Sequence, residues 1–270
     1  MIKDILLRLD DADIDGEKLK AVAELASLFN AHVTGLFFNV IPSLVPVTGE
    51  PSADLLKAAR ARAYLIEGRL KQLLEGVGQT EEIRQFEVFP DEVTGMIVRE
   101  CRAADVFLTQ GAEGDSMQQS LIEDVLFQSG RHLIIVPRAE WPRHAVRSIV
   151  IGWNETREAA RAVGEALPYL YAADTVTIVA VINSKPLDGD PVIGISLQRH
   201  LQHHGIHAVL HHVIGKEEEV ADRLLAEAKI REAGLIVIGG YSHSRIREWL
   251  LGGVTKKFLR HSPVPLLIAH

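Results

Sequence analysis

The sequence is poor in several features that mark particular classes of protein. It contains a single cysteine, Cys101, which excludes an internal disulfide framework and suits a reducing compartment. No apolar run approaches the length of a membrane span. Charges interrupt the apolar stretch at residues 1–9, which predicts a first strand rather than a signal peptide. We therefore expect a cytoplasmic protein that does not act on a membrane.

Basic charge and catalytic signatures are also scarce. The 29 lysine and arginine residues face 36 aspartate and glutamate residues, so the chain lacks the basic surface that non-specific nucleic-acid binding needs. The sequence has no Gly-x-Ser-x-Gly elbow and no Walker A lysine, and no paired acid and base stands out. We assign no catalytic residue, and slow ATP hydrolysis is the most that we would expect of it as an enzyme.

What is present is typical of a globular protein with a substantial core. Apolar residues make up 47% of the 270 residues and charged residues 24%, enough for one large domain or two ordinary ones. Cys101 follows the apolar residues Ile97 and Val98, and we expect it to pack a helix, the alternative being a reactive thiol.

The chain contains an internal duplication, with copies at residues 1–138 and 147–270 joined by a short linker. In both copies apolar strands alternate with helical patterns, beginning and ending with a strand. The corresponding strands are Lys3–Asp10 and Arg147–Asn154, Val33–Phe38 and Val176–Val181, Ala104–Gly111 and Ala233–Gly240, and Ser129–Pro137 and Ser262–His270.

Near-continuous apolar strands separated by helices predict a parallel sheet that is covered on both faces. The fold class that we expect is α/β, with two tandem, doubly wound, Rossmann-like domains. Each would have a five-stranded, mostly parallel sheet. Ligands of such sheets bind at the carboxyl ends of the strands, so Asn154 and the loop after the fourth strand should be neighbours.

The last 36 residues carry the clearest functional pattern. The strand Leu235–Ile238 ends in Gly239 and Gly240, and a second glycine pair, Gly252 and Gly253, precedes a basic helical segment. A glycine-rich loop before a helix exposes free backbone N–H groups at the positive end of the helix dipole. This order of elements predicts an anion site, with phosphate as the obvious ligand.

Together these features resemble the universal stress protein family in its tandem, UspA-like form, over essentially the whole chain. The nucleotide loop of that family has two glycines three residues apart, then a third glycine followed by Ser or Thr. Here Gly239 and Gly252 match, Ser242 replaces the second glycine, and Gly253 stands at the closing hydroxyl position. The resemblance also implies that the two copies are related by a pseudo-two-fold axis and that their final strands pair or abut across it.

By this resemblance the second copy binds an adenine nucleotide, ATP or AMP, with Mg²⁺ accompanying ATP. Asn154 and Val181 would lie near the base and ribose. The phosphates would be held by Gly239, Gly240, Ser242, His243, Arg245, Gly252, Gly253, Val254 and Thr255, with positive charge from Lys256 and Lys257. Asn154 has an alternative role as the N-cap of the next helix.

The first copy serves as an internal comparison. It has Asp10 where the second copy has Asn154, and Glu123 and Asp124 align with Lys256 and Lys257. Carboxylates at a helix N-terminus satisfy its dipole and repel a polyphosphate, so we expect no nucleotide in the first copy.

Histidines cluster near the middle of the second copy, at His200, His203, His204, His207, His211 and His212. One interpretation is a metal site, and the other is a set of ordinary helix and strand positions. We predict a helix at Ile195–His204 closed by Gly205, and a strand at Ile206–Leu210. This places His203 and His204 in the last helical turn, and we assign no metal ligand. The acidic run Glu217–Glu219 is interpreted as a solvated helix start.

These features lead to a hypothesis and an alternative. The hypothesis is a cytoplasmic stress-response protein that binds an adenine nucleotide in its second copy, with an unknown protein partner and homodimerisation as open possibilities. The alternative is a non-enzymatic protein-interaction module that binds no nucleotide.

Overall fold

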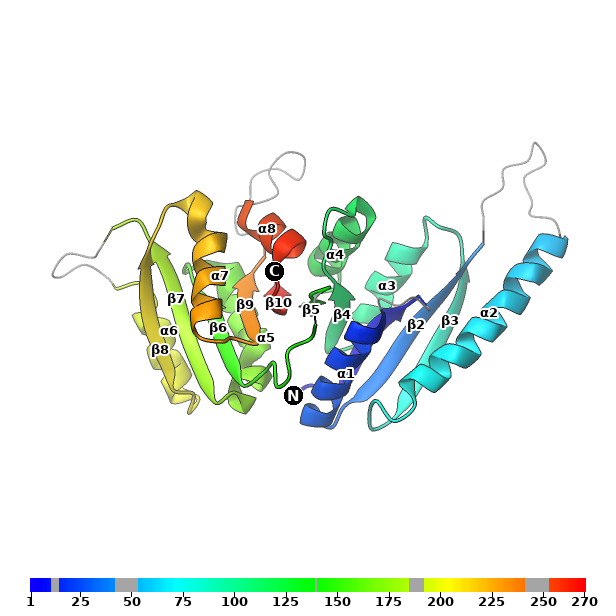
Figure 1. The fold of residues 1–270 in the computed structure, drawn as a ribbon, viewed down its shortest axis with the longest axis horizontal. Coiled ribbons are helices and arrows are strands. Elements are labelled where there is room, and N and C mark those ends of the chain that lie inside the picture. The colour runs from blue at the N-terminus through cyan, green and yellow to red at the C-terminus, as the bar shows by residue number, and fades with distance from the viewer. Residues whose placement is uncertain (11–14, 42–52, 139, 185–191, 241–252) are drawn as a thin grey trace. The chain divides into compact units, whose positions relative to one another are not determined.

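The structure, a computed structural model, describes residues 1–10, 15–41, 53–138, 140–184, 192–240 and 253–270. Its internal contacts divide the chain into two compact units. Unit 1 comprises residues 1–109 and 121–131, and unit 2 comprises residues 110–120 and 132–270 (Figure 1). The division differs from a simple cut between the two copies, because the last strand of the first copy belongs to unit 2.

Strands and helices alternate along unit 1, and its strands pair in parallel in the order β3-β2-β1-β4. The first turn of the helix that follows β4 belongs to unit 2. The elements are β1 (Asp4–Leu9), α1 (Asp15–Phe29), β2 (His32–Val40), α2 (Ala53–Leu74), β3 (Glu81–Val88), α3 (Val93–Cys101), β4 (Val106–Gln110) and α4 (Ser116–Gln128).

Unit 2 has the strand order β5-β10-β9-β6-β7-β8, and α7 lies in front of this sheet with α5 and α6 behind it (Figure 1). The elements are β5 (His132–Val136), β6 (Ser148–Gly152), α5 (Arg157–Ala172), β7 (Thr175–Ile182), α6 (Ile195–His203), β8 (Ala208–Ile214), the 3₁₀ turn η1 (Glu217–Glu219), α7 (Val220–Ile230), β9 (Leu235–Gly239), α8 (Gly253–His261) and β10 (Leu266–Ala269). The predicted α/β class with a doubly wound, mostly parallel sheet is confirmed.

Burial explains why these residues form the strands. Every residue of β5 and β10 is buried, and β9 is buried up to its last residue, Gly239. Strands that are apolar at successive positions can be buried only if helices cover both faces of the sheet. The backbone hydrogen bonds of a parallel sheet then satisfy the polar groups of these fully buried segments.

The two final strands of the duplicated pattern pair with each other inside unit 2. β5 runs antiparallel to β10, with Leu267 opposite Ile134 and Ile268 opposite Leu133. This confirms the expectation that these strands pair or abut. Unit 2 thus has the parallel array of β6 to β10 and gains one antiparallel strand at the β10 side.

The strand order places a crevice at one edge of the unit 2 sheet. From β6 the chain moves outward to β7 and β8, and then crosses back to β9 on the other side of β6. The order of strands therefore reverses between β6 and β9, which is where open α/β sheets bind their ligands.

The strand predicted at Ile206–Leu210 is displaced in the structure. β8 begins at Ala208 and continues to Ile214, because β7 reaches Ile182 and offers it backbone partners along that whole length. His207 thus precedes the strand, and it does not share a strand face with His211. The helix prediction is confirmed, since α6 ends at His203 and Gly205 adopts a φ of 75°.

Cys101 is buried at the end of α3, with 1% of its surface exposed. Burial raises the pKa of its thiol to about 12. The packing interpretation is therefore confirmed, since a thiolate does not form here near neutral pH. Among the helices that the structure describes, none has the length and apolar composition that crossing a membrane requires.

Candidate functional site

A pocket of about 680 Å³ opens at the carboxyl edge of the unit 2 sheet. The ends of β6, β7 and β9 form its floor, and η1 with the first turns of α7 forms one wall. Residues of α8 form another part of the wall. We call it the unit 2 pocket. It lies at the point of strand reversal, where the topology favours a ligand site.

Five residues predicted to contact a nucleotide line this pocket together. Asn154 and Val181 contribute from the ends of β6 and β7, and Gly239, Val254 and Thr255 contribute from β9 and α8. They come from separate parts of the sequence, and the crossovers of the fold bring them to one edge. The hydrogen bond from Trp153 N–H to the carbonyl of Val179, 3.0 Å long, joins two of the strand ends.

Asn154 does not cap the next helix. The N-cap of α5 is Thr156, whose hydroxyl accepts a hydrogen bond from the N–H of Ala159 at 3.3 Å. The Asn154 side-chain oxygen instead accepts from the Thr156 hydroxyl at 2.8 Å. The N-cap alternative is therefore wrong by two residues, because Glu155 adopts a φ of 58° and α5 begins only at Arg157. The exposed Asn154 amide nitrogen borders the pocket as a donor.

Gly239 has a packing role that the sequence pattern did not suggest. A Cβ atom at this position would lie 2.9 Å from Ala159 Cα and closer still to the backbone nitrogen of Ala159. Only glycine lets the first turn of α5 approach β9 so closely. Gly239 also lines the pocket, so its small size leaves space on that side as well.

Gly240 does not offer a free amide to a ligand. Its N–H donates to the carbonyl of Ala269 at 2.8 Å, and its own carbonyl lies 3.0 Å from His270 Nδ1. Gly240 is also absent from the lining of the pocket. A role for Gly240 at the phosphates stays a prediction, but its amide is already engaged, because β10 continues one residue past Ile268 to Ala269.

Several predicted phosphate ligands fall outside the part of the chain that the structure describes. They are Ser242, His243, Arg245 and Gly252. Gly253 is the first residue of α8, and Val254 and Thr255 follow in its first turn. Thr255 is buried, with 4% of its surface exposed.

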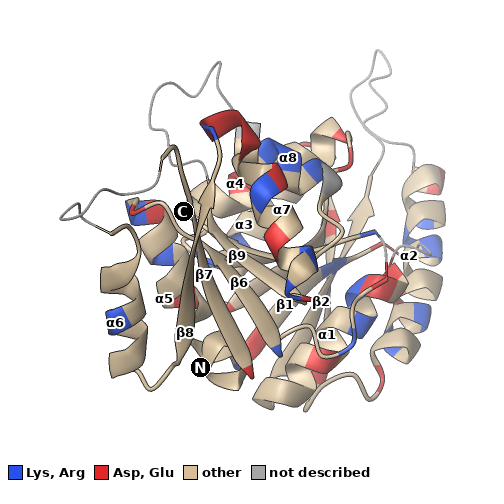
Figure 2. Ribbon diagram, turned by 60° about the vertical axis from the view of Figure 1, so that its left-hand side comes forward, with Lys and Arg blue, Asp and Glu red and all other residues tan. Residues whose placement is uncertain are grey.

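Positive charge on α8 is partly neutralised by the neighbouring helix. Lys257 lines the pocket, and its ammonium group donates to Asp222 of α7 at 2.6 Å. In Figure 2 the basic residues of α8 lie beside acidic residues of α7. Lys257 was expected to supply positive charge for phosphates, but in the structure much of that charge is satisfied by a protein carboxylate.

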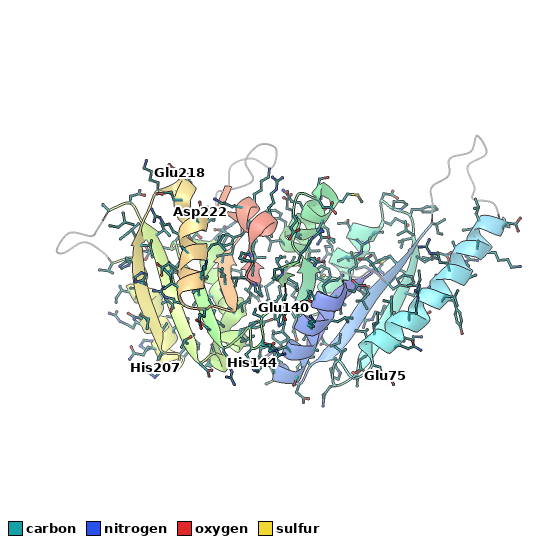
Figure 3. All side chains as sticks on the ribbon, viewed as in Figure 1. Glu75, Glu140, His144, His207, Glu218 and Asp222 are labelled. Atoms are coloured by element: carbon teal, nitrogen blue, oxygen red, sulfur yellow. The ribbon has the colours of Figure 1, made fainter. Side chains whose placement is uncertain are left out.

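The wall formed by η1 and α7 was missed by the sequence reasoning. Lys216, Glu217 and Glu218 line the pocket, whereas the acidic run was interpreted only as a solvated helix start. Figure 3 shows Glu218 and Asp222 at the start of α7, on the side of α8. The signal available was the position of this run directly after a strand, at the same edge as the other strand ends.

Glu219 fixes the geometry of this wall. Its carboxylate accepts from the N–H of Lys216 at 2.9 Å and pairs with Arg223 at 3.1 Å. The hydrogen bond from Lys216 and the charge of Arg223 lower the pKa of Glu219. Glu219 is therefore ionised at neutral pH, and it orders the turn that carries the pocket residues.

In unit 1 the residue after β1, Asp10, is held by charged side chains of the same unit. Asp10 pairs with Arg8 at 2.8 Å, and its N–H donates to the buried Asp15 carboxylate at 2.9 Å. Lys18, also buried, pairs with Asp15 at 2.6 Å and donates to the Arg8 carbonyl at 2.7 Å. Absence of a nucleotide from the first copy stays a prediction.

The alignment of the two copies predicts the wrong carboxylates at the start of α4. α4 begins at Ser116, so Glu123 and Asp124 lie about two turns inside the helix rather than at its start. The carboxylate at the N-terminus is Asp115, which accepts from the N–H groups of Met117 and Gln118 at 2.9 and 3.1 Å. The free N–H groups at the start of α4 are therefore bonded by a carboxylate, as predicted, but the carboxylate is that of Asp115.

The histidines of unit 2 make contacts with nearby side chains. The rings of His200 and His204 lie 4.7 Å apart between centroids, and the Tyr171 hydroxyl lies 3.0 Å from His204 Nδ1. His212 Nε2 donates to the carbonyl of Ile193 at 2.8 Å. Within the described ranges, no three His, Cys, Asp or Glu side chains group closely enough to hold a metal ion.

Comparisons with known proteins match the second copy to a protein family and nearly the whole chain to solved structures. Residues 145–270 match the Universal stress protein family. A universal stress protein from Archaeoglobus fulgidus DSM 4304 has a similar structure, with a TM-score of 0.76 and 16% identity over 98% of this chain and 95% of that chain. No curated protein matches the sequence.

Two further solved structures are similar over nearly the whole chain. One, from Pseudomonas aeruginosa UCBPP-PA14 and assigned to the same family, has a TM-score of 0.61 and 16% identity over 99% of this chain and 93% of that chain. The other is the cytoplasmic domain of a prokaryotic cation chloride cotransporter, with a TM-score of 0.53 and 9% identity over 99% and 95%. At such low identities these similarities show the fold alone.

Proposed function

We propose that the unit 2 pocket binds an adenine nucleotide, because residues 145–270 match the universal stress protein family. The role that follows is that of a cytoplasmic stress-response protein in which nucleotide binding is the signal and no reaction is catalysed. Asn154 and Val181 would contact the base and ribose, and the α8 side of the pocket would face the phosphates.

One observation carries the proposal: residues predicted separately from the sequence line a single pocket of about 680 Å³. This volume lies within the roughly 300–1,000 Å³ that small-molecule sites occupy. Its lining is mixed. Val179, Val181 and Leu224 offer apolar contacts to a flat base, and the Asn154 amide and the Lys257 ammonium offer polar ones.

The proposal is tested by thermal unfolding of the full chain with adenosine, AMP, and ATP with Mg²⁺. A ligand that binds only the folded state raises the melting temperature with its concentration, and guanosine and inorganic phosphate serve as controls. No shift with any of the three adenine compounds at millimolar concentration would remove the proposal.

A pair of matched variants locates the binding site. Val181→Phe places a larger side chain in the pocket. The control, Val209→Phe, makes the same change on the neighbouring strand, at a residue that is 64% exposed and does not line the pocket. We expect the ligand-induced shift to be lost in Val181→Phe and kept in Val209→Phe. Equal shifts in both variants would place the ligand elsewhere.

A second candidate function is a protein-interaction module that binds no nucleotide. It is favoured by Gly240, whose amide is engaged by Ala269, and by Lys257, whose charge is engaged by Asp222. Both groups are thereby withdrawn from a phosphate. Absence of any adenine-dependent shift, with the fold intact by circular dichroism, would favour this candidate.

A further inference from the structure

β8 is the end strand of the unit 2 sheet, and among the described strands only β7 pairs with it (Figure 1). It is also the most exposed strand of that sheet. Every other strand of unit 2 contains buried residues, whereas β8, which the structure describes in full, contains none. Val209 and Ile214 are 64% and 49% exposed. Apolar side chains thus remain accessible along a strand that has one free edge.

The hydrogen bonds of the β8 backbone show which residues face this free edge. The N–H of Gly215, directly after the strand, donates to the carbonyl of Ile182 in β7 at 3.0 Å. Backbone groups alternate in direction along a strand, so every second residue of β8 directs its backbone groups away from β7. The carbonyl of the first of these, Ala208, accepts from the Gln198 side chain at 2.9 Å. Within the described ranges, the others have no backbone partner on that side: Leu210, His212 and Ile214.

The end strands of the two units differ in the protection of their free edges. Proteins commonly keep an exposed strand edge from pairing by placing charged side chains on it. β3, the end strand of unit 1, has this protection, since four of its eight residues are charged: Glu81, Glu82, Arg84 and Glu87. β8 has no Asp, Glu, Lys or Arg among its seven residues, and its polar residues are His211 and His212. β8 therefore lacks the charges that oppose the pairing of another strand with β3.

We propose that β8 pairs antiparallel with β8 of a second copy of this chain, so that the protein forms a homodimer whether or not it binds a nucleotide. A second copy fits because a two-fold axis brings identical edges together, and β8 carries no acidic or strongly basic residue that would repel its counterpart. Full overlap of residues 208–214 places His211 opposite the partner's His211 on the axis. Leu210 then lies opposite the partner's His212, and their outward backbone groups form hydrogen bonds. Within unit 2 the chain already joins its two copies by an antiparallel pair, β5 with β10.

Sedimentation velocity of the full chain over a concentration series tests the association. We expect the average mass to rise from 29.8 kDa toward twice that value with concentration. His211→Lys places two ammonium groups opposite each other on the axis and should weaken the dimer about fivefold. The matched control, His207→Lys, makes the same change at an exposed residue before the strand and should leave the dissociation constant unchanged. A monomer at every concentration up to about 1 mM, or equal effects of the two variants, would overturn the proposal.

An engineered disulfide tests the antiparallel arrangement. Opposed residues of a non-hydrogen-bonded antiparallel pair have Cα atoms about 4.5 Å apart, a separation that a disulfide can span. His211→Cys should therefore give a covalent dimer on mild oxidation, and the buried Cys101 does not compete. The control, His207→Cys, is exposed, but the two copies of residue 207 would lie at opposite ends of the paired strands, so we expect no covalent dimer. Equal yields from the two variants, or no disulfide in His211→Cys, would overturn the arrangement.

Discussion

Replacement of Gly239 by alanine tests whether this glycine is required by packing. The new Cβ would lie 2.9 Å from Ala159 Cα, within the first turn of α5. Backbone atoms cannot relieve this clash by a change of rotamer, so α5 or β9 must shift. Overpacking destabilises a folded protein by roughly 1–3 kcal/mol, and we expect a value near the upper end of this range. Replacing glycine also reduces the conformational freedom of the unfolded chain, which stabilises the folded state by about 0.4–1 kcal/mol. We expect a net destabilisation of about 2 kcal/mol.

Gly164 provides a control in the same helix. It is an exposed residue in the middle of α5, and a Cβ there would have no neighbour within 4 Å. Gly164→Ala should therefore stabilise the protein by about 0.5–1 kcal/mol, since alanine is the better helix former. The two variants make the same chemical change with opposite expected signs.

Tryptophan fluorescence during urea unfolding is a suitable assay for both variants. Trp141 and Trp153 belong to the described part of unit 2, so their signal reports on the unit that contains both glycines. The unfolding midpoint should fall for Gly239→Ala and rise for Gly164→Ala. If Gly239→Ala unfolded at the same midpoint as the unchanged protein, the close approach of α5 to β9 would be wrong.

Three further predictions concern groups that the structure buries or pairs. His132→Phe should destabilise unit 2 by about 1–3 kcal/mol in the same urea assay, because the buried imidazole bonds Glu165 at 3.1 Å and Tyr169 at 3.0 Å; an unchanged midpoint would contradict this. Cys101, whose thiol pKa is raised to about 12, should react with a thiol reagent at pH 8 only after denaturation. Burial raises the pKa of Glu158, but its hydrogen bond and ion pair with Arg157 outweigh this and hold the pKa below 4.5. The stability from Glu158 is then present above pH 4.5 and lost as pH falls through the lowered pKa, so Glu158→Gln and the unchanged protein should converge in urea stability at acid pH.

The sheet was predictable because its signal is local. Runs such as Leu235–Ile238 are apolar at successive positions, and such runs recur in the same order in both copies, so element type and order follow from the sequence. Strand ends were less certain: β8 continues to Ile214 because β7 offers it partners, and that depends on a strand more than thirty residues earlier in the chain.

The site was predictable only in part, because its details depend on contacts between distant segments. Asn154 and Val181 could be placed at one edge from topology alone. Two contacts join residues about thirty positions apart, and no local sequence pattern predicts them. They are the hydrogen bond from Gly240 to Ala269 and the ion pair of Asp222 with Lys257. The same holds for Glu217 and Glu218, whose charge pattern suits a solvated helix start as well as a pocket wall.

Photoaffinity labelling tests most directly where an adenine nucleotide binds. The full chain would be irradiated with 8-azido-AMP, with and without excess AMP, and the labelled peptides identified by mass spectrometry. The account predicts AMP-protected label on peptides that contain Asn154 or Val181. Label that AMP does not suppress, or protected label confined to residues 1–109, would contradict it.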